Sequence, residues 1–453
     1  MPPKAQLSPD AFEADSAAIL SAPLTLPSGA TLPNRLVKAA MSELLADPHN
    51  RATPAHQTLY GSWARNGPGL LLTGNVQIDR HHMEHAGNVA IQGRQDAEQL
   101  AALRAWSAAA KREGSQIWMQ LAHAGRQTQR WVNATPKAPS AVPLALPGIK
   151  FGTPIALTEA EIRDLIERFG YAATIARETG FNGVELHAAH GYLFSQFLSP
   201  RSNLREDGWG GDLAGRARFL LEVVRTIRTK VGADFPIGIK LNSADFQRGG
   251  FSFEDSQVVA GWLDDASVDL IEISGGTWEQ PKMANIEGVE PAFDPFVSKA
   301  SREREAYFAR FAPEMRKHLK RTKLMVTGGF RTARGMADAI ANGGVDLIGL
   351  GRPLALAPEA AGRLLRGEPV DLAQPDHRLR LGSGLLGPQS PIKLLRAING
   401  LGSMTWYNEQ IIRLGAGLSP DREMKFLPAF ISMQNRDKRM AEALDYGDGR
   451  SEA

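Results

Sequence analysis

The sequence contains no cysteine. Disulfides are therefore excluded, and so are iron–sulfur clusters and zinc sites with thiolate ligands, because all of them need cysteine sulfur. A covalent thioether to a prosthetic group is excluded for the same reason. Any cofactor of this protein must be held through other side chains or through the backbone.

An excess of charge and a long hydrophobic run are also missing. The 453 residues include 52 Lys and Arg against 49 Asp and Glu, a net charge of +3, which argues against nucleic acid as a partner. No run approaches the roughly eighteen apolar residues that a membrane-spanning helix needs. Residues 1–20 contain acids and prolines and lack the apolar core of a secretory signal. We therefore expect a cytoplasmic protein without membrane association.

Apolar runs of strand length recur along the chain. Hydrophobic residues make up 43% of the sequence, which is ample for a large buried core. A run such as Leu70-Leu71-Leu72 is typical of parallel strands that are buried on both faces. The candidate strands are residues 35–40, 70–74, 116–121, 184–186, 237–241, 269–273, 324–327 and 346–350.

Helical segments separate these strands. A capping box at Thr158 predicts a helix that stops at Gly180, and a similar pattern at Ser252 predicts a second one. Further helical stretches are residues 303–319 and 332–341. Eight strands alternating with helices predict an α/β protein of the (β/α)₈ barrel, or TIM barrel, class. A doubly wound open sheet is the alternative, but no Gly-x-Gly-x-x-Gly follows the first strand.

The sequence divides into three parts around this barrel. Residues 1–23 are an N-terminal segment that we expect to be irregular. Residues 24–360 form the barrel, which begins with a β-hairpin over residues 24–32 and a turn at Ser28-Gly29. Residues 361–453 are a C-terminal extension, partly helical and without a chemical motif. We expect the extension to pack on the barrel or on a partner subunit, so a homo-oligomer is possible.

The stretch from Gly183 to Asp212 carries the densest chemistry. His187 stands at the C-terminal end of the fourth strand, and His190 and Tyr192 follow at once. Parallel α/β folds keep their functional side chains at these strand ends. Two imidazoles and a phenol within six residues can bind an oxygen atom and deliver a proton. We predict that these three residues are catalytic.

The residues around this cluster resemble a known family. The pattern His-x-x-His-Gly-Tyr-Leu, followed by Gln-Phe-Leu-Ser-Pro and Ser-Asn-x-Arg-x-Asp-x-x-Gly-Gly, is similar to that of the Old Yellow Enzyme family of FMN-dependent ene-reductases. The resemblance implies that His187 and His190 anchor the substrate and that Tyr192 donates the proton. The matching residues of the longer signature are Ser199, Pro200, Ser202, Asn203, Arg205, Asp207, Gly210 and Gly211.

Two glycine turns predict a phosphate site. Gly328-Gly329 follows the seventh strand and Gly351-Arg352 follows the eighth, where barrels usually bind phosphate. Glycine lets backbone N–H groups approach an anion closely, and arginine can bind it with two hydrogen bonds. The resemblance identifies this anion as the phosphate of FMN.

The resemblance also implies contacts with the flavin ring. Gln120 matches the family's flavin-binding glutamine, and its amide suits the alternating donors and acceptors of the pyrimidine edge. Lys240 replaces the family's usual arginine near N1 and C2=O, where reduced flavin develops negative charge. The remaining residues expected at the flavin, all near the ends of the first two strands, are Ala40, Met41, Ser42 and Gly74.

Several nearby residues have other interpretations. Glu185, His187 and His190 form a possible metal site, although no further carboxylate ligand is evident, and we expect no metal. The histidines of the segment Asp79-Arg80-His81-His82-Met83-Glu84-His85 are expected to be loop residues. Trp278 is a candidate wall of the substrate pocket. Structural ion pairs are expected for Arg216, Arg218 and Glu222.

We therefore predict a flavin-dependent oxidoreductase with non-covalent FMN. NADH or NADPH reduces the flavin, which then reduces an activated C=C bond of an α,β-unsaturated carbonyl or nitro compound, as the resemblance implies. Two alternatives remain open: an amine or N-methyl dehydrogenase of the same superfamily, and a histidine-based metallohydrolase on the same barrel.

Overall fold

The structure, a computed structural model, describes residues 9–146, 150–280, 307–372, 375 and 378–445. Eight parallel strands close into a barrel, because the last strand pairs with the first. This closure confirms the (β/α)₈ fold and rules out the open sheet. In their order around the barrel from the first, the strands are β3 (Leu36–Lys38), β4 (Leu70–Gln77), β5 (Gln116–Ala122), β8 (Gly183–Ala188), β9 (Ile237–Asn242), β10 (Leu270–Ser274), β11 (Lys323–Thr327) and β12 (Leu347–Leu350).

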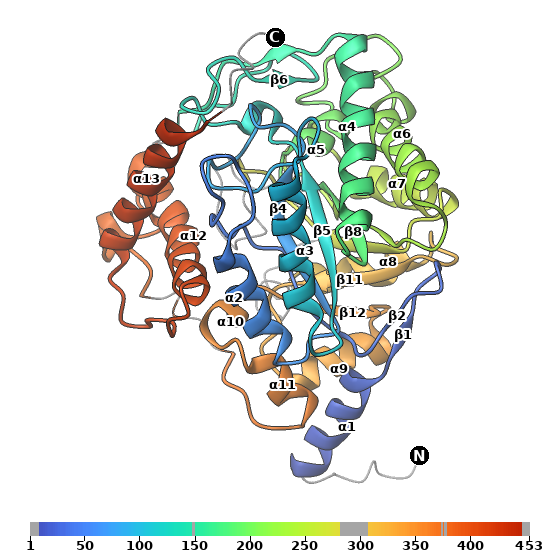
Figure 1. Cartoon of the computed structure of the whole chain (residues 1–453), viewed down its shortest axis with the longest axis vertical. Coiled ribbons are helices and arrows are strands. Elements are labelled where there is room, and N and C mark those ends of the chain that lie inside the picture. Colours follow the sequence, from blue (N-terminus) through green and yellow to red (C-terminus); the bar gives the residue numbers. More distant parts are fainter. Residues whose placement is uncertain (1–8, 147–149, 281–306, 373–374, 376–377, 446–453) are drawn as a thin grey trace.

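Helices cover the outside of this barrel (Figure 1). Thr158 caps the helix that its sequence pattern predicted, and Ser252 caps the second one. The predicted helix at 303–319 lies partly outside the described residues, and from Tyr307 onward it is a 3₁₀ turn, η4 (Tyr307–Phe311), followed by the short helix α8 (Ala312–Arg316). The helices of the barrel are α2 (Pro54–Ala64), α3 (Ala97–Lys111), α4 (Glu159–Glu178), α5 (Leu193–Leu198), α6 (Leu213–Val231), α7 (Phe253–Asp265), α8 (Ala312–Arg316), α9 (Ala333–Asn342), α10 (Arg352–Leu356) and α11 (Ala360–Leu365).

A β-hairpin closes the N-terminal end of the barrel. Its strands β1 (Leu24–Thr25) and β2 (Thr31–Leu32) pair antiparallel, as predicted. Leu24, Leu26 and Leu32 join a separate hydrophobic core with the ring of Trp118 and other barrel side chains. These apolar contacts therefore close the N-terminal end of the barrel.

A second short sheet, β6 (Lys137–Ala138) with β7 (Ile155–Ala156), lies beyond β5, and 3₁₀ turns occur at η1 (Gly125–Gln127) and η6 (Gly384–Leu386).

The two ends of the chain add helices to this frame. The segment before residue 24 was expected to be irregular, but it contains α1 (Pro9–Ser21), whose Leu20 is fully buried. The extension forms α12 (Lys393–Gly415) and α13 (Phe426–Ala443), drawn in orange-red and red beside the barrel in Figure 1. Trp406 of α12 is buried and donates a hydrogen bond to the carbonyl of Met424 at 2.9 Å. That bond lies within the extension, whereas α12 also lies against α2 of the barrel, and Asp437 of α13 accepts the backbone N–H of Ala86 at 2.9 Å.

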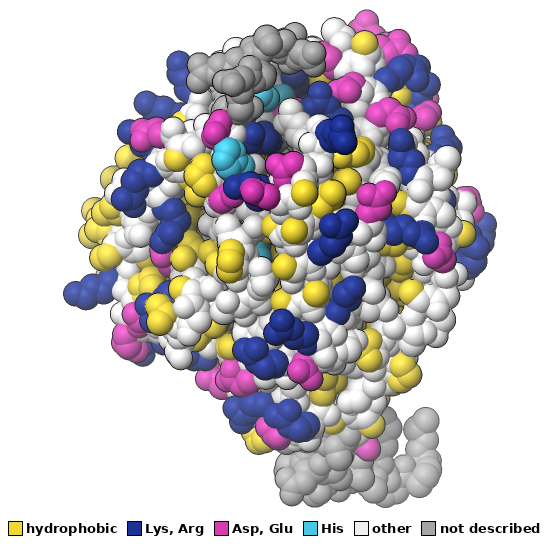
Figure 2. All heavy atoms as spheres, in the orientation of Figure 1, with side chains coloured by type: hydrophobic (Ala, Val, Ile, Leu, Met, Phe, Trp, Pro, Cys, Tyr) yellow, Lys and Arg dark blue, Asp and Glu magenta, His cyan; other side chains and the backbone are white. Residues whose placement is uncertain are grey.

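Hydrophobic side chains remain exposed on this extension. Figure 2 shows them gathered on the left edge of the molecule, over α12 and α13. Leu394, Leu427 and Ile431 are each about half exposed. The possible homo-oligomer remains a prediction. Among the described residues, no helix has the length and apolarity that a membrane crossing requires.

Asp269 links the hairpin to the barrel wall. We predict that Asp269→Ala destabilises the fold by about 3–5 kcal/mol, because a buried ion pair then loses one partner. Its carboxylate is buried and accepts hydrogen bonds from the backbone N–H of Ser28 at 2.7 Å and of Ile237 at 2.9 Å. It also pairs with Arg228 at 3.1 Å.

Urea unfolding followed by circular dichroism measures this loss. Asp265→Ala is the matched control, because Asp265 is largely exposed and, within the described part of the chain, its ion pair is with an exposed lysine. Equal unfolding free energies for the two variants would contradict the role assigned to Asp269.

Candidate active site

A cavity of about 330 Å³ lies at the carboxyl ends of the barrel strands. Its size is in the range of small-molecule and cofactor sites. Residues within or directly after all eight barrel strands contribute to its lining, so residues far apart in the sequence meet there. The predicted site residues that line it are Ala40, Met41, Ser42, Gln120, His187, His190, Tyr192, Lys240, Gly328, Gly329, Gly351 and Arg352.

Gly74 does not belong to this lining. Its N–H donates to Glu43 at 2.7 Å, and a Cβ added at this position would lie 2.5 Å from the carbonyl oxygen of Met41. The glycine lets the turn after β3 approach β4 closely, so it supports Ser42 from behind. The pairing register of β4 shifts between Leu72 and Asn75, and the side chain of Asn75 lines the cavity instead.

His187 is held as a neutral hydrogen-bond donor. Burial lowers the pKa of its imidazole well below the usual value, and the neighbouring His190 and Lys240 lower it further. Nδ1 accepts a hydrogen bond from the backbone N–H of Ala189 at 3.3 Å. The proton of the neutral ring is therefore on Nε2, which can donate to an oxygen atom.

His190 occupies a tight turn beside His187. Its φ angle is 60°, in the left-handed region, and the two imidazole centroids are 4.8 Å apart. Burial and the charge of Lys240 lower the pKa of His190 well below its usual value. Its Nε2 lies 2.6 Å from the hydroxyl of Ser274, at the end of β10. Ser274 thus orients this ring.

Tyr192 lies beside the two histidines. It precedes α5, and its ring packs edge-to-face on His187 with 4.7 Å between the centroids. Burial raises the pKa of its phenol well above the usual value, and repulsion between a phenolate and Glu84 raises it further. Glu84 also accepts a hydrogen bond from the Ser42 hydroxyl at 2.5 Å. The phenol therefore keeps its proton at neutral pH.

Lys240 has carboxylates within the barrel as partners. Its ammonium lies 3.1 Å from Glu272. Burial lowers the pKa of Lys240, but the charges of Glu272 and Glu185 outweigh this effect and raise it. Burial and the charge of Glu272 raise the pKa of Glu185, which accepts a hydrogen bond from Gln120 at 2.6 Å. Lys240 therefore remains a cation at the cavity while its charge is partly balanced.

The buried carboxylate Glu185 bears on the hypothesis of a metal site at this strand. Unlike His187 and His190, Glu185 is not part of the cavity lining. Its raised pKa favours the protonated form, which is a poor metal ligand. These features weigh against the metallohydrolase alternative.

The glycine turns leave their backbone open to the cavity. Gly328 and Gly329 have φ angles of 90° and 82°, and no atom lies within 4 Å of a Cβ added at Gly328. The buried hydroxyl of the preceding Thr327, which lines the cavity, has no hydrogen-bond partner among the described residues. Arg352 begins α10 on the neighbouring strand end. This arrangement suits an anion.

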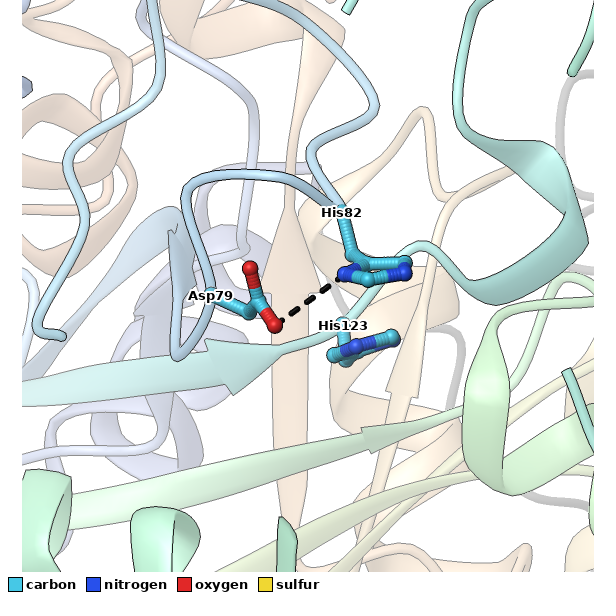
Figure 3. A group of neighbouring side chains, drawn as sticks. All are labelled: Asp79, His82 and His123. Carbon is cyan, nitrogen blue, oxygen red and sulfur yellow. Dashed lines mark ion pairs between the residues drawn. The ribbon is translucent and has the colours of Figure 1, made fainter. Parts of the chain in front are cut away.

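A second group of ligating side chains lies outside this cavity (Figure 3). Asp79 follows β4, His82 is on the same loop, and His123 follows β5. The Asp79 carboxylate lies 3.1 Å from Nδ1 of His82 and 3.3 Å from Arg168. The two imidazoles stack with their centroids 4.5 Å apart. His82 was expected to be a simple loop residue, so this buried cluster was not foreseen.

The backbone around this cluster disfavours a metal ion. Nε2 of His82 accepts the N–H of Lys137 at 2.8 Å, and Nδ1 of His123 accepts the N–H of Gly125 at 3.1 Å. A neutral histidine that binds a metal through one nitrogen carries its proton on the other, which then donates. In both rings one nitrogen accepts a backbone N–H, so in the neutral ring the proton is on the other nitrogen, which then cannot bind a metal. We interpret the cluster as structural.

Comparison with known proteins identifies the family of the chain. The model of the NADH:flavin oxidoreductase / NADH oxidase family matches residues 20–370. The chain belongs to this family. It is an FMN-dependent oxidoreductase that uses NADH or NADPH, and the resemblance to the Old Yellow Enzyme family is confirmed.

Curated relatives in this family come from both fungi and bacteria. The NADH-dependent flavin oxidoreductase iliE of Neonectria sp. (strain DH2) is 40% identical over 351 residues, which cover 74% of this chain and 45% of that protein. The chain thus spans less than half of that relative. The NADH-dependent flavin oxidoreductase iccE of Talaromyces variabilis is 38% identical over 361 residues, which cover 75% of this chain and 84% of that protein.

Solved structures share the barrel. An old yellow enzyme homologue from Zymomonas mobilis superposes with a TM-score of 0.64 at 24% identity, over 78% of this chain and 93% of that one. Histamine dehydrogenase from Rhizobium sp. 4-9 superposes with a TM-score of 0.69 at 22% identity, over 90% of this chain and 55% of that one. At these identities the two similarities establish the fold.

The cavity fits an FMN molecule. Buried polar atoms of its lining have no hydrogen-bond partner among the described residues, and a polar cofactor would satisfy them: Asn75 Oδ1, Glu84 Oε2, Glu272 Oε2 and Thr327 Oγ1. The open glycine turns with Arg352 suit the phosphate, and Gln120 and Lys240 suit the pyrimidine edge. The sequence interpretation missed Glu84, although it stands in the histidine-rich segment already noted.

We predict that metal removal leaves this enzyme unchanged. Metal analysis of the purified protein should find substoichiometric zinc, because the backbone donors occupy the acceptor nitrogens of His82 and His123. Prolonged dialysis against EDTA should alter neither the bound flavin nor the unfolding temperature. Stoichiometric zinc that disappears in His123→Ala would show that the Asp79 cluster binds a metal.

Proposed function

We propose that the enzyme reduces the activated C=C bond of α,β-unsaturated carbonyl or nitro compounds. The observation that carries this proposal is the grouping of a neutral imidazole donor, His187, with the protonated phenol of Tyr192 in the cavity that fits FMN. Bound FMN supplies the hydride that NAD(P)H delivers. The protein residues supply oxygen binding and the proton.

The histidines act on the substrate oxygen. Nε2–H of His187 donates a hydrogen bond to the carbonyl or nitro oxygen, and His190, oriented by Ser274, contributes from the adjacent turn. Both imidazoles stay neutral because they are buried near Lys240, so neither protonates the oxygen outright. Their hydrogen bonds withdraw electron density from the β-carbon and favour attack there.

Tyr192 provides the proton for the α-carbon. Its phenol stays protonated because burial and Glu84 oppose the phenolate. Proton donation leaves a tyrosinate next to a carboxylate, which favours rapid recovery of a proton from solvent. An amine dehydrogenase would instead need a base that accepts a proton from an ammonium or amine substrate, and neutral Tyr192 is poorly suited to that role.

Tyr192→Phe tests this assignment. We predict that it slows reoxidation of reduced flavin by simple enones about 10²–10⁴-fold, the usual scale of general acid catalysis. Flavin reduction by NAD(P)H needs no such proton and should stay within a small factor of the unaltered enzyme. Stopped-flow absorbance resolves the two half-reactions. An intact enone reaction would remove Tyr192 from the mechanism, and equal losses in both would indicate a role in pocket shape.

His187→Ala serves as the comparison variant. It should weaken phenol binding as well as enone turnover, because the imidazole holds the oxygen atom. Turnover of amines without any enone reaction would favour the dehydrogenase alternative.

Lys240→Met should lower the reduction potential of the bound flavin. The reduced flavin loses a fixed cation, and about 30–60 mV is expected, since about 30 mV corresponds to 1.4 kcal/mol for a two-electron couple. Glu272→Gln should shift the potential in the opposite direction, because it removes the negative charge paired with Lys240. Equilibration with redox dyes measures both. An unaltered potential in both variants would mean that this pair does not influence the flavin.

A further inference from the structure

The C-terminal extension contacts the active-site loops at separate points. Asn408 of α12 donates a hydrogen bond from its side-chain amide to the backbone carbonyl of Ser42 at 2.9 Å. The guanidinium carbon of Arg352 lies 5.7 Å from the ring centre of Tyr407, also on α12. Asp437 of α13 accepts the backbone N–H of Ala86 at 2.9 Å. The extension thus contacts the loops that follow three different strands, β3, β4 and β12.

One face of α12 also forms part of the cavity wall. Leu401, Met404, Asn408 and Ile411 follow the three- and four-residue spacing of a helix face, and all line the cavity. The family match ends at residue 370, whereas α12 begins at Lys393. This wall therefore comes from a region beyond the part of the chain that the family shares.

The contacts fall on residues that we assign to the cofactor. Ser42 is fixed from two sides, since its hydroxyl donates to Glu84 while its carbonyl accepts from Asn408. Arg352, assigned to the phosphate, lies at the edge of cation–π distance from the buried ring of Tyr407. Loss of either contact would leave the barrel strands untouched but remove one of the constraints on a residue that we assign to the flavin.

We propose that the C-terminal extension completes the flavin site, with Asn408 and Tyr407 as positioning residues for Ser42 and Arg352. This proposal rests on the assignment of Ser42 and Arg352 as FMN contacts. The α12 helix thereby adds to the cofactor affinity of the barrel and sets the environment of the flavin ring near Ser42.

Asn408→Ala and Tyr407→Leu test the proposal in the full chain. Each should raise the dissociation constant of FMN about two- to tenfold, the range that corresponds to one hydrogen bond or one cation–π contact. Asn408→Ala should also shift the flavin reduction potential, because the Ser42 turn is released. Flavin fluorescence reports the dissociation constant, and redox dyes report the potential. Asn435→Ala is the matched control, since Asn435 lies exposed on the same extension.

The outcomes separate positioning from mere packing. Unchanged affinity and potential in both variants would overturn the proposal. The proposal would also be overturned if each variant lowered the unfolding temperature of the apoprotein and FMN binding weakened only in proportion to that loss of stability. Asn408→Asp, which removes the N–H donor but keeps the side-chain size, should reproduce the effects of Asn408→Ala. An enzyme that binds FMN in this way but reduces no enone would keep this proposal and refute the proposed substrate class.

Discussion

The site depends on the parallel pairing of β12 with β3, which closes the barrel. Only three residue pairs form this seam, Ile348 with Leu36, Gly349 with Val37 and Leu350 with Lys38. Because parallel strands end on the same side, the closure brings the turn at Gly351 next to the turn at Met41, where the added Cβ of Gly351 would lie 3.8 Å from the methionine sulfur. Residues about 310 positions apart therefore share one cofactor cavity.

The sequence was informative wherever a local rule decides the outcome. All eight strands were predicted because strands buried on both faces read as apolar runs, and Thr158 and Ser252 marked helix starts through their caps. The meeting of His187, His190 and Tyr192 at one cavity could be predicted because strand ends carry function in this fold. The charged partners of the buried site residues could not be predicted. The pairing of Lys240 with Glu272 depends on the lateral register of β9 and β10, which no local pattern specifies.

Glu272 and Glu84, which the sequence did not identify, matter because they control the buried charges of the site. A lysine within a barrel needs a counter-charge, and Glu272 supplies it from the neighbouring strand β10. The same carboxylate limits how much positive potential Lys240 offers to a ligand. Glu84 has the corresponding effect on Tyr192, where it opposes the phenolate. The acidity and the charge of this site are therefore set by residues that the family motif does not contain.

The polar groups of the cavity and its apolar wall come from different parts of the chain. The polar groups that we propose act on a substrate, His187, His190 and Tyr192, come from the barrel and lie within the region that the family model matches. The apolar face of α12 comes from outside that region. A change in α12 alters the volume and shape of the cavity without moving the hydrogen-bond donors, because those are fixed by β8 and by Ser274. Side chains of α12 such as Leu401 and Met404 can thus alter the shape of the cavity without replacing the hydrogen-bond donors that the barrel supplies.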